Sequence, residues 1–216
     1  YSERLQNEAA VCADQLVADG AIGRVLQVIG LGPHRLQASD RPDWFFKKDT
    51  YGGILIDLGS HQIEQFLYYA GATSATITSS RVANYNHPEY PELDDFGDAA
   101  LVADTGVTNY FRVDWFTPDG LSTWGDGRTI ILGTDGYIEL RKNLDVAREH
   151  TLDHVYLVNG KEEKHLHVTG QYGFPYFGRL IRDCMDGTET AMTQEHAFTA
   201  AELCIQVQKE AVRVYG

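Results

Sequence analysis

The sequence predicts an α+β domain built on a large, open and mostly antiparallel β-sheet, with its helices packed on one face. Helical periodicity is confined to the two ends of the chain and to residues 51–71, whereas strand-like runs follow one another between residues 74 and 169. Consecutive strands without intervening helices favour hairpin pairing, because parallel pairing needs a long crossover. The 216 residues, of which 43% are hydrophobic, suffice for a sizeable core. We therefore expect a single domain over residues 1–216.

The first third of the chain predicts a helix, a strand and a second helix. Over residues 2–18 the side chains of Leu5, Ala9, Cys12 and Leu16 recur at three- and four-residue steps, and Gly20 ends the pattern. A β-rich run at residues 25–31 predicts a strand whose character extends to residue 36. A polar loop at residues 39–50 precedes the helix expected at residues 51–71.

The middle of the chain predicts a strand meander, and the C-terminal part predicts two helices. Strands are expected at residues 74–85, 98–103, 107–116, 121–132, 137–142, 155–158 and 164–169. The dipeptide Asp135-Gly136 stands between two of these runs and is a strong hairpin signal. Alternation along residues 107–116 predicts one apolar and one polar face. The helices are expected at residues 174–186 and 194–214.

Composition argues against two classes of partner and indicates a reducing compartment. The chain has 31 acidic and 18 basic residues, so its net charge of −13 repels phosphate backbones and we expect no nucleic-acid partner. No apolar stretch is long enough to cross a bilayer, so we expect no membrane partner. The cysteines are odd in number and form no C-x-x-C pair, which indicates free thiols and a cytoplasmic location; they are Cys12, Cys184 and Cys204.

The helix expected at residues 51–71 carries a polar stripe. On a regular helix Asp57, His61, Glu64 and Tyr68 share one face. Gly59 falls on the apolar stripe, which predicts close packing against a neighbour. The default interpretation is a solvated face with an ordinary i, i+4 ion pair. The alternative is an acid–base pair, in which the Asp57 carboxylate orients the His61 imidazole and raises its pKa for proton exchange with a substrate hydroxyl.

This helix resembles the signature helix of the oxidoreductase family typified by glucose-fructose oxidoreductase and inositol dehydrogenase, the Gfo/Idh/MocA family. The stretch "YGGILIDLGSHQIE" departs from the family pattern at Glu64, where the family usually has Asp, and matches it at Gly52, Gly53, Asp57, Gly59 and His61. The segments at residues 16–28, 132–140 and 190–211 resemble further parts of the family's C-terminal domain. The resemblance therefore covers nearly the whole chain.

The resemblance implies the second half of a two-domain enzyme. Family members bind NAD or NADP in an N-terminal Rossmann domain, which we presume to lie upstream of this chain. The G-x-G runs at Gly30 and Gly125 lack a third glycine, and Pro33 removes a backbone N–H, so both runs predict turns in β structure. The family's Glu-Lys-Pro run, with its catalytic lysine, does not occur. We expect NAD or NADP in the intact enzyme, with most cofactor-binding residues in the missing domain. The fragment alone is expected to bind no cofactor and to be inactive.

The activity implied by the resemblance is hydride transfer to or from a sugar, inositol or related polyol. In this reaction the resemblance implies that His61 accepts the proton of the substrate hydroxyl in oxidation, or donates it in reduction. It implies that Asp57 hydrogen-bonds to the substrate or orients His61. The substrate, the choice of nucleotide and the direction stay open. So do three alternatives: NAD-assisted glycoside hydrolysis or isomerisation, a non-enzymatic sugar-binding or oligomerisation module, and a metal-dependent hydrolase that adds His165 and His167 to this pair.

Five further side chains are candidates for substrate contact, each with a structural role as its alternative. They are Arg41 and Trp44 in the loop before the signature helix, His34 and Arg35 at the end of the first strand, and Tyr172. An arginine can hold a carboxylate or a phosphate, and an indole can stack on a sugar ring. The glycine-rich run at residues 124–128 is either a substrate loop or a bulge with a surface ion pair.

Two more predictions concern metal binding and assembly. His165 and His167 share one face of an expected strand, but the sequence indicates no third ligand nearby, so no metal site is predicted. One face of residues 107–116 mixes polar and charged side chains, and a sheet with helices on one side needs a partner or polar residues on the other. The resemblance implies a partner, because family members form dimers or tetramers through the open face of the sheet. We therefore expect a homo-oligomer formed through that face.

Overall fold

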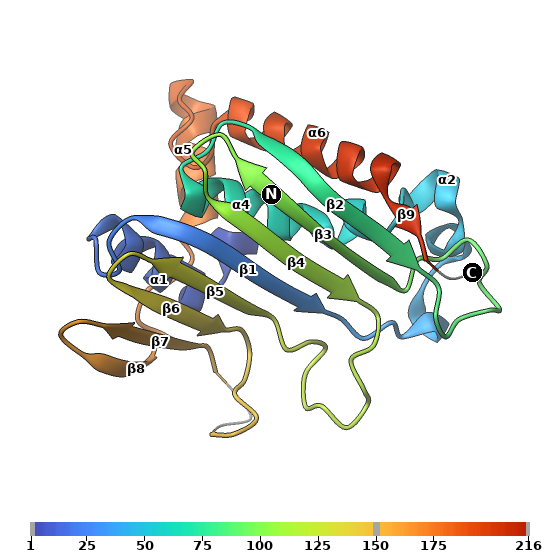
Figure 1. Ribbon diagram of the computed structural model, residues 1–216, viewed down its shortest axis with the longest axis horizontal. Coiled ribbons are helices and arrows are strands. Elements are labelled where there is room, and N and C mark those ends of the chain that lie inside the picture. The colour runs from blue at the N-terminus through green and yellow to red at the C-terminus, as the bar shows by residue number, and fades with distance from the viewer. Residues whose placement is uncertain (1–2, 149–151, 215–216) are drawn as a thin grey trace.

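The computed structural model describes residues 3–148 and 152–214, and a nine-stranded open sheet organises them (Figure 1). The strands lie in the order β8-β7-β6-β5-β1-β4-β3-β2-β9. Their bounds are β1 Val25–Pro33, β2 Ala75–Ala83, β3 Phe96–Ala103, β4 Thr108–Asp114, β5 Arg128–Gly133, β6 Gly136–Arg141, β7 His154–Asn159, β8 Glu163–His167 and β9 Val212–Arg213.

The pairing is antiparallel throughout this sheet except between β1 and β4 and between β2 and β9. The parallel β1–β4 pair arises because the helical segment after β1 returns the chain to one edge. The β2-β3-β4 meander then leads back to the middle of the sheet. The mostly antiparallel sheet expected from the sequence is confirmed. So is the alternation along β4, where Asn109, Phe111 and Val113 are buried on one face.

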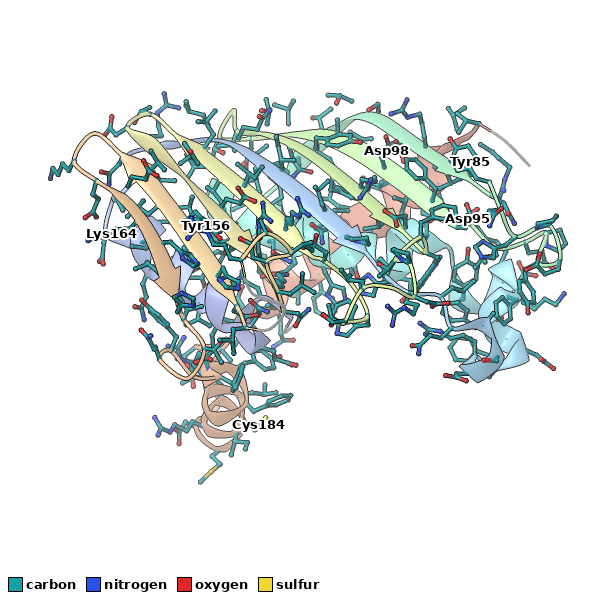
Figure 2. All side chains as sticks on the ribbon, turned by 90° about the horizontal axis from the view of Figure 1, so that it is seen from below. Tyr85, Asp95, Asp98, Tyr156, Lys164 and Cys184 are labelled. Atoms are coloured by element: carbon teal, nitrogen blue, oxygen red, sulfur yellow. The ribbon has the colours of Figure 1, made fainter. Side chains whose placement is uncertain are left out.

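The helices cover one face of the sheet and leave the other open (Figure 1). Apolar side chains of the sheet and of this helical layer form one core; the largest include Phe66, Phe111, Ile131, Ile138 and Leu140. Helix α5 projects away from the sheet with Cys184 near its outer end (Figure 2). The helical bounds are η1 Glu3–Gln6, α1 Glu8–Ala18, η2 Ala38–Asp40, η3 Asp43–Phe46, α2 Lys48–Tyr51, α3 Ile54–Asp57, α4 Gly59–Ala70, α5 Pro175–Asp186 and α6 Gln194–Glu210.

The helix expected at residues 51–71 is divided into three pieces, which corrects the prediction of a regular helix. Gly52 and Gly53 separate α2 from α3 with φ angles of 85° and 114°, which favour glycine. The side-chain oxygen of Gln208, on α6, accepts a hydrogen bond of 2.9 Å from the Leu55 N–H and so caps the start of α3. Leu58 then separates α3 from α4.

Gly59 packs closely against the sheet, as its place on the apolar stripe predicts. A Cβ atom built there would lie 3.2 Å from Cε2 of Phe111, a buried side chain of the central strand β4. The missing side chain thus lets the first turn of α4 lie directly on the sheet. This contact fixes the position of the residues that follow on the same turn.

Three further predictions are corrected by the structure. The first helix is interrupted at Asn7, whose side chain accepts from Ala10 N and caps α1. The last helix ends at Glu210, and the chain then forms β9 on the edge of β2. Gly30 lies inside β1 and not in a turn; a Cβ there would be 2.0 Å from Oε1 of Gln62 on α4.

Among the described residues, no helix is long and apolar enough to span a bilayer.

Candidate active site

A cavity of about 230 Å³ lies where β1 ends beside the first turn of α4. Two of the residues predicted from the sequence line it, His61 from α4 and His34 from the segment after β1. Its other walls include Gln62, Trp124 and Lys142. The elements that form the cavity are thus the signature helix, the end of a central strand and the glycine-rich run at residues 124–128.

Aromatic packing and one hydrogen bond hold the His34 ring. Its centroid lies 4.4 Å from that of Trp124 and 5.6 Å from that of Trp115. Its Nδ1 is 3.1 Å from the carbonyl oxygen of Gly32. A carbonyl can only accept, so Nδ1 carries the proton and, in the neutral ring, Nε2 is the acceptor. The ring is therefore presented in a defined orientation and tautomer.

Asp57 and His61 lie on either side of the break between α3 and α4. Both side chains are half-buried. Burial raises the pKa of the Asp57 carboxyl above its ordinary value, while the nearby charges of Arg41 and His61 act in the opposite direction. The two residues are thus electrostatically coupled in a partly desolvated setting, which differs from the fully solvated ion pair of the default interpretation.

Arg41 is near enough to act electrostatically on Asp57, and its side chain is held by contacts of its own. Its Nε donates to the carbonyl oxygen of Leu36 at 3.1 Å, and its guanidinium lies 4.5 Å from the ring of Phe45 and 5.0 Å from that of Trp115. Trp115 therefore contacts both Arg41 and His34. Of the candidates predicted from the sequence, the structure brings four into one neighbourhood: His34, Arg41, Asp57 and His61.

The other three candidates lie elsewhere. Arg35 donates to the carbonyl oxygens of Pro118 and Leu121 and so fastens the loop after β4. Trp44 is 54% exposed, with its ring against Phe45. Tyr172 packs beside α1, where a hydrogen bond between its hydroxyl and Cys12, together with burial, raises its pKa to about 12.

The polar stripe on the signature helix divides into two parts. Glu64 is only 2% exposed and accepts hydrogen bonds from Nε of Arg4 at 3.2 Å and from Nε2 of His196 at 3.1 Å. Arg4 also covers the ring of Tyr68 at 3.4 Å. This end of the helix therefore joins the N-terminal segment to α6, and the default interpretation of a solvated face is wrong at Glu64.

Sequence reasoning missed two residues of the cavity wall. Lys142 is buried at the end of β6, and its backbone N–H donates to the Gly127 carbonyl oxygen at 2.9 Å. Gln62 reaches over the glycines of β1. Trp124 belongs to the glycine-rich run for which a substrate loop was one of two interpretations, and the ion pair expected in that run forms between Arg128 and Asp126. No spacing in the sequence links Lys142 to His61, because β6 reaches the cavity only through the order of the sheet.

The G-x-G run at Gly30 does not form a phosphate-binding turn in the structure. The G-x-G run at Gly30 lies within β1, and the side chain of Gln62 occupies the space beside both of its glycines. A phosphate-binding turn instead needs exposed backbone N–H groups at the start of a helix. The run therefore lacks the geometry of a dinucleotide-binding fingerprint.

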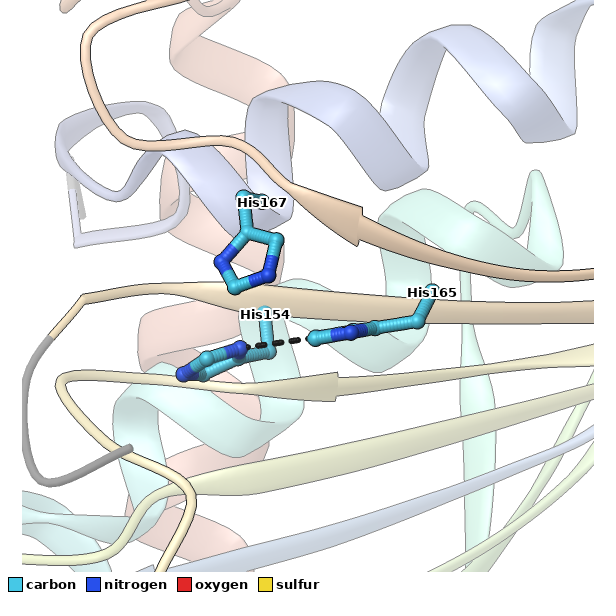
Figure 3. Close-up of side chains that lie close together, drawn as sticks. All are labelled: His154, His165 and His167. Atoms are coloured by element: carbon cyan, nitrogen blue, oxygen red, sulfur yellow. Dashed lines mark hydrogen bonds between the residues drawn. The ribbon is translucent and has the colours of Figure 1, made fainter. Parts of the chain in front are cut away.

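The histidine pair at residues 165 and 167 lies away from His61 and Asp57, on the edge strand β8. β8 is four strands from β1 in the sheet, and at about 4.8 Å between neighbouring strands that is roughly 19 Å. The hypothesis of a single hydrolytic site made of these histidines with His61 and Asp57 is therefore wrong. The expectation that no third ligand lies near the pair is also wrong, because His154 lies beside them (Figure 3).

Comparisons with known proteins agree with this geometry. The model of the GFO/IDH/MocA C-terminal domain matches residues 11–139. A crystal structure from Erwinia carotovora atroseptica, of a protein named as an oxidoreductase, is 53% identical with a TM-score of 0.95 and covers 98% of this chain and 63% of its own. No curated protein sequence matches the chain.

Two more distant structures share the fold. The aldose-aldose oxidoreductase from Caulobacter crescentus, complexed with glycerol, is 16% identical with a TM-score of 0.74, covering 98% of this chain and 60% of its own. Levoglucosan dehydrogenase in complex with NADH is 16% identical with a TM-score of 0.69, covering 97% and 63%. The chain thus spans less than two thirds of the length of each of these proteins.

Proposed function

Because the chain belongs to the GFO/IDH/MocA family as a C-terminal domain, we propose that it supplies the substrate side of an NAD(P)-dependent oxidoreductase acting on a sugar, inositol or related polyol. The observation that carries this proposal is the cavity that His34 and His61 line, with Asp57 and Arg41 beside it. His61 of the family signature is thus part of the cavity wall.

His61 exchanges the proton of the substrate hydroxyl. Imidazole is suited to this step because its pKa lies near neutrality, and general acid–base catalysis of this kind contributes about 10²–10⁴-fold in rate. The half-buried Asp57 interacts with the imidazolium form and so favours proton uptake. The nicotinamide, when bound, accepts or donates the hydride.

The cavity walls suit a polyhydroxylated ring. His34 and Trp124 offer ring faces for stacking on the apolar face of a sugar. Lys142 and Gln62 bring hydrogen-bond donors that can reach hydroxyl oxygens. The names of two proteins of the same fold, an aldose-aldose oxidoreductase and a levoglucosan dehydrogenase, support this substrate class.

The cofactor is held by a dinucleotide-binding domain outside these residues. The chain covers 63% of the Erwinia protein, which supports the proposal that a separate domain of the intact protein holds the cofactor. The cavity described here is then closed by that domain, which excludes water during the reaction. The described residues do not decide between NAD and NADP, since the residues that choose between them lie on the cofactor domain.

The test compares two proteins. One is the full product of the gene, with whatever residues it encodes beyond this chain, here called the gene-encoded protein; the other is the 216-residue chain. Each is incubated with NAD⁺ or NADP⁺ and a panel of aldoses, inositols and anhydro-sugars, and reduced nicotinamide is followed by absorbance. We expect net cofactor reduction with the gene-encoded protein and none with the 216-residue chain. Robust turnover by the chain alone would contradict the proposal that a separate domain holds the cofactor.

The same assay separates the alternatives. Product that forms without accumulation of reduced cofactor would point to NAD-assisted glycoside hydrolysis or isomerisation. Sugar binding without any turnover in the gene-encoded protein would point to a non-enzymatic binding module. Either result would overturn the dehydrogenase proposal.

A further inference from the structure

Three histidines meet on the β7–β8 hairpin at the edge of the sheet (Figure 3). His154 on β7 pairs directly opposite His167 on β8, and Tyr156 pairs opposite His165. Side chains alternate along strands, so His165 and His167 point to the same face as their partners on β7. Val155 and Leu157 point the other way, into the core. The histidines therefore lie on the open face of the sheet, away from the helices and from His61.

The ring nitrogens are close enough to share one ion. Nδ1 of His154 lies 2.9 Å from Nε2 of His165, and one nitrogen from each of the three rings lies within 4.8 Å of the others. Ligand nitrogens about 2.0–2.1 Å from a tetrahedral Zn²⁺ are roughly 3.4 Å apart. A small inward adjustment of His167 thus brings the three nitrogens to coordination distance.

We propose that His154, His165 and His167 bind a divalent transition-metal ion, with Zn²⁺ as the first candidate. Three imidazoles without a thiolate suit Zn²⁺, and Ni²⁺ or Cu²⁺ by the same ligand preference. Three protein ligands leave a fourth position for water. The exposure of the ligands rises from the buried His154 to the exposed His167, so this position faces solvent.

Neighbouring residues hold the ligands in place. The ring of His165 stacks on that of Tyr156, with centroids 4.6 Å apart and an interplanar angle of 9°. The Tyr156 hydroxyl donates to Asp145, which also accepts from Arg141 at 3.0 Å. Such outer contacts orient ligands and add to metal affinity.

A cationic side chain lies beside the cluster and depends on the tautomer of His165. Arg148 approaches Nδ1 of His165 at 3.5 Å, on the side away from His154. Ligation through Nε2 puts the proton on Nδ1, so this arginine no longer donates there when the metal binds.

The bound ion would cross-link the two strands at this edge of the sheet. β8 is the last strand on this side, and its residues are half-buried or exposed. An ion held by one residue of β7 and two of β8 fixes the two strands in register. This role is independent of the proposed redox chemistry, which is centred on His61 on the helical side of the sheet.

The experiment measures zinc retained by the gene-encoded protein. The protein is stripped with a chelator, reloaded with Zn²⁺, passed through gel filtration and analysed for metal. The cluster is removed with the H165Q and H167Q double variant, whose partly exposed side chains can change without disturbing the core. H87Q is the matched control, because His87 lies at the other end of the sheet, hydrogen-bonded to Asp95.

We expect the wild type and the control to retain one more zinc ion per chain than the double variant, whose affinity falls by about 100-fold or more. Zinc should also raise the melting temperature of the wild type and leave that of the double variant unchanged. Co²⁺ in place of zinc should give the visible spectrum of a tetrahedral site in the wild type only. Equal zinc content in wild type and double variant, with circular dichroism confirming that both are folded, would overturn the proposal.

Discussion

Asp57 is a carboxylate in a partly desolvated position, which disfavours its charged form. Its side chain is half-buried, and burial raises its pKa despite the nearby Arg41 and His61. A group of this kind costs stability when it ionises, and such costs are typical of functional sites. The arrangement therefore agrees better with a role at His61 than with a role in holding the fold together.

Replacing Asp57 with Asn should stabilise the folded chain at neutral pH. The raised pKa means that the folded state holds its proton more tightly than the unfolded state. The wild type therefore loses stability as the pH rises from the unfolded pKa through the folded one. A tenfold difference in proton affinity between the two states corresponds to about 1.4 kcal/mol of unfolding free energy.

Urea unfolding of both proteins between about pH 4 and pH 8 checks this prediction. The stability advantage of D57N over the wild type should grow with pH and then level off. A variant less stable than the wild type by the same amount at every pH would contradict it.

The site residues differ in how far the sequence could predict them. Asp57 and His61 were recognisable because they stand in one short stretch beside the glycines of the family signature. The fixed orientation of His34 was not, because it comes from Trp115 and Trp124, far along the chain. Lys142 and His154 carried no local signal either, since the register of paired strands determines their neighbours.

The break at the start of α4 shows how tertiary contacts shape an element. The apolar periodicity of residues 51–71 is that of one helix, yet Gln208 caps α3 from 153 positions away. Most strand positions were predicted well, because alternation and the Asp135-Gly136 turn are local features. The strand expected at residues 121–132 was wrong at its start, since β5 begins only at Arg128. Contacts made by α6 and by the β2 edge were not, which explains the wrong end of the last helix.

Adding a methyl group at two helical glycines should have opposite effects on stability. At Gly59 the new Cβ meets the buried ring of Phe111 at 3.2 Å, whereas at Gly178 on α5 nothing lies within 4 Å. G59A should destabilise the chain by about 1 kcal/mol, since overpacking of a core typically costs 1–3 kcal/mol and outweighs the gain in helix propensity. G178A should stabilise it by about 0.5–1 kcal/mol. Chemical denaturation of both variants tests this, and a stabilised G59A would show that α4 does not rest on β4 as described.

The two faces of the whole molecule differ in the side chains that they carry. The helical face holds the candidate active site, and the open face carries exposed apolar side chains such as Leu132 on β5 and Tyr137 on β6. An exposed apolar sheet face suits assembly of identical chains. The net charge of −13 limits non-specific association and so favours a defined contact.

A charge on the open face should therefore weaken self-association. L132D should shift the gene-encoded protein toward smaller species in sedimentation velocity, because the contact would have to bury a carboxylate. I205D on α6 is the matched control, since Leu132 is 41% exposed and Ile205 43% exposed. If L132D and the wild type have the same mass in solution, or if only I205D dissociates, the open face is not the interface.

The most direct test of the whole account is the rate of hydride transfer in the gene-encoded protein with His61 replaced by Asn. The substrate found in the panel assay is used at saturation, and H87N is measured beside it as a change of the same kind outside the cavity. The account predicts that kcat falls by about 10²–10⁴-fold in H61N, with cofactor binding and fold retained, and stays unchanged in H87N. A folded H61N enzyme with the wild-type kcat would contradict the claim that this domain carries the proton-transferring residue.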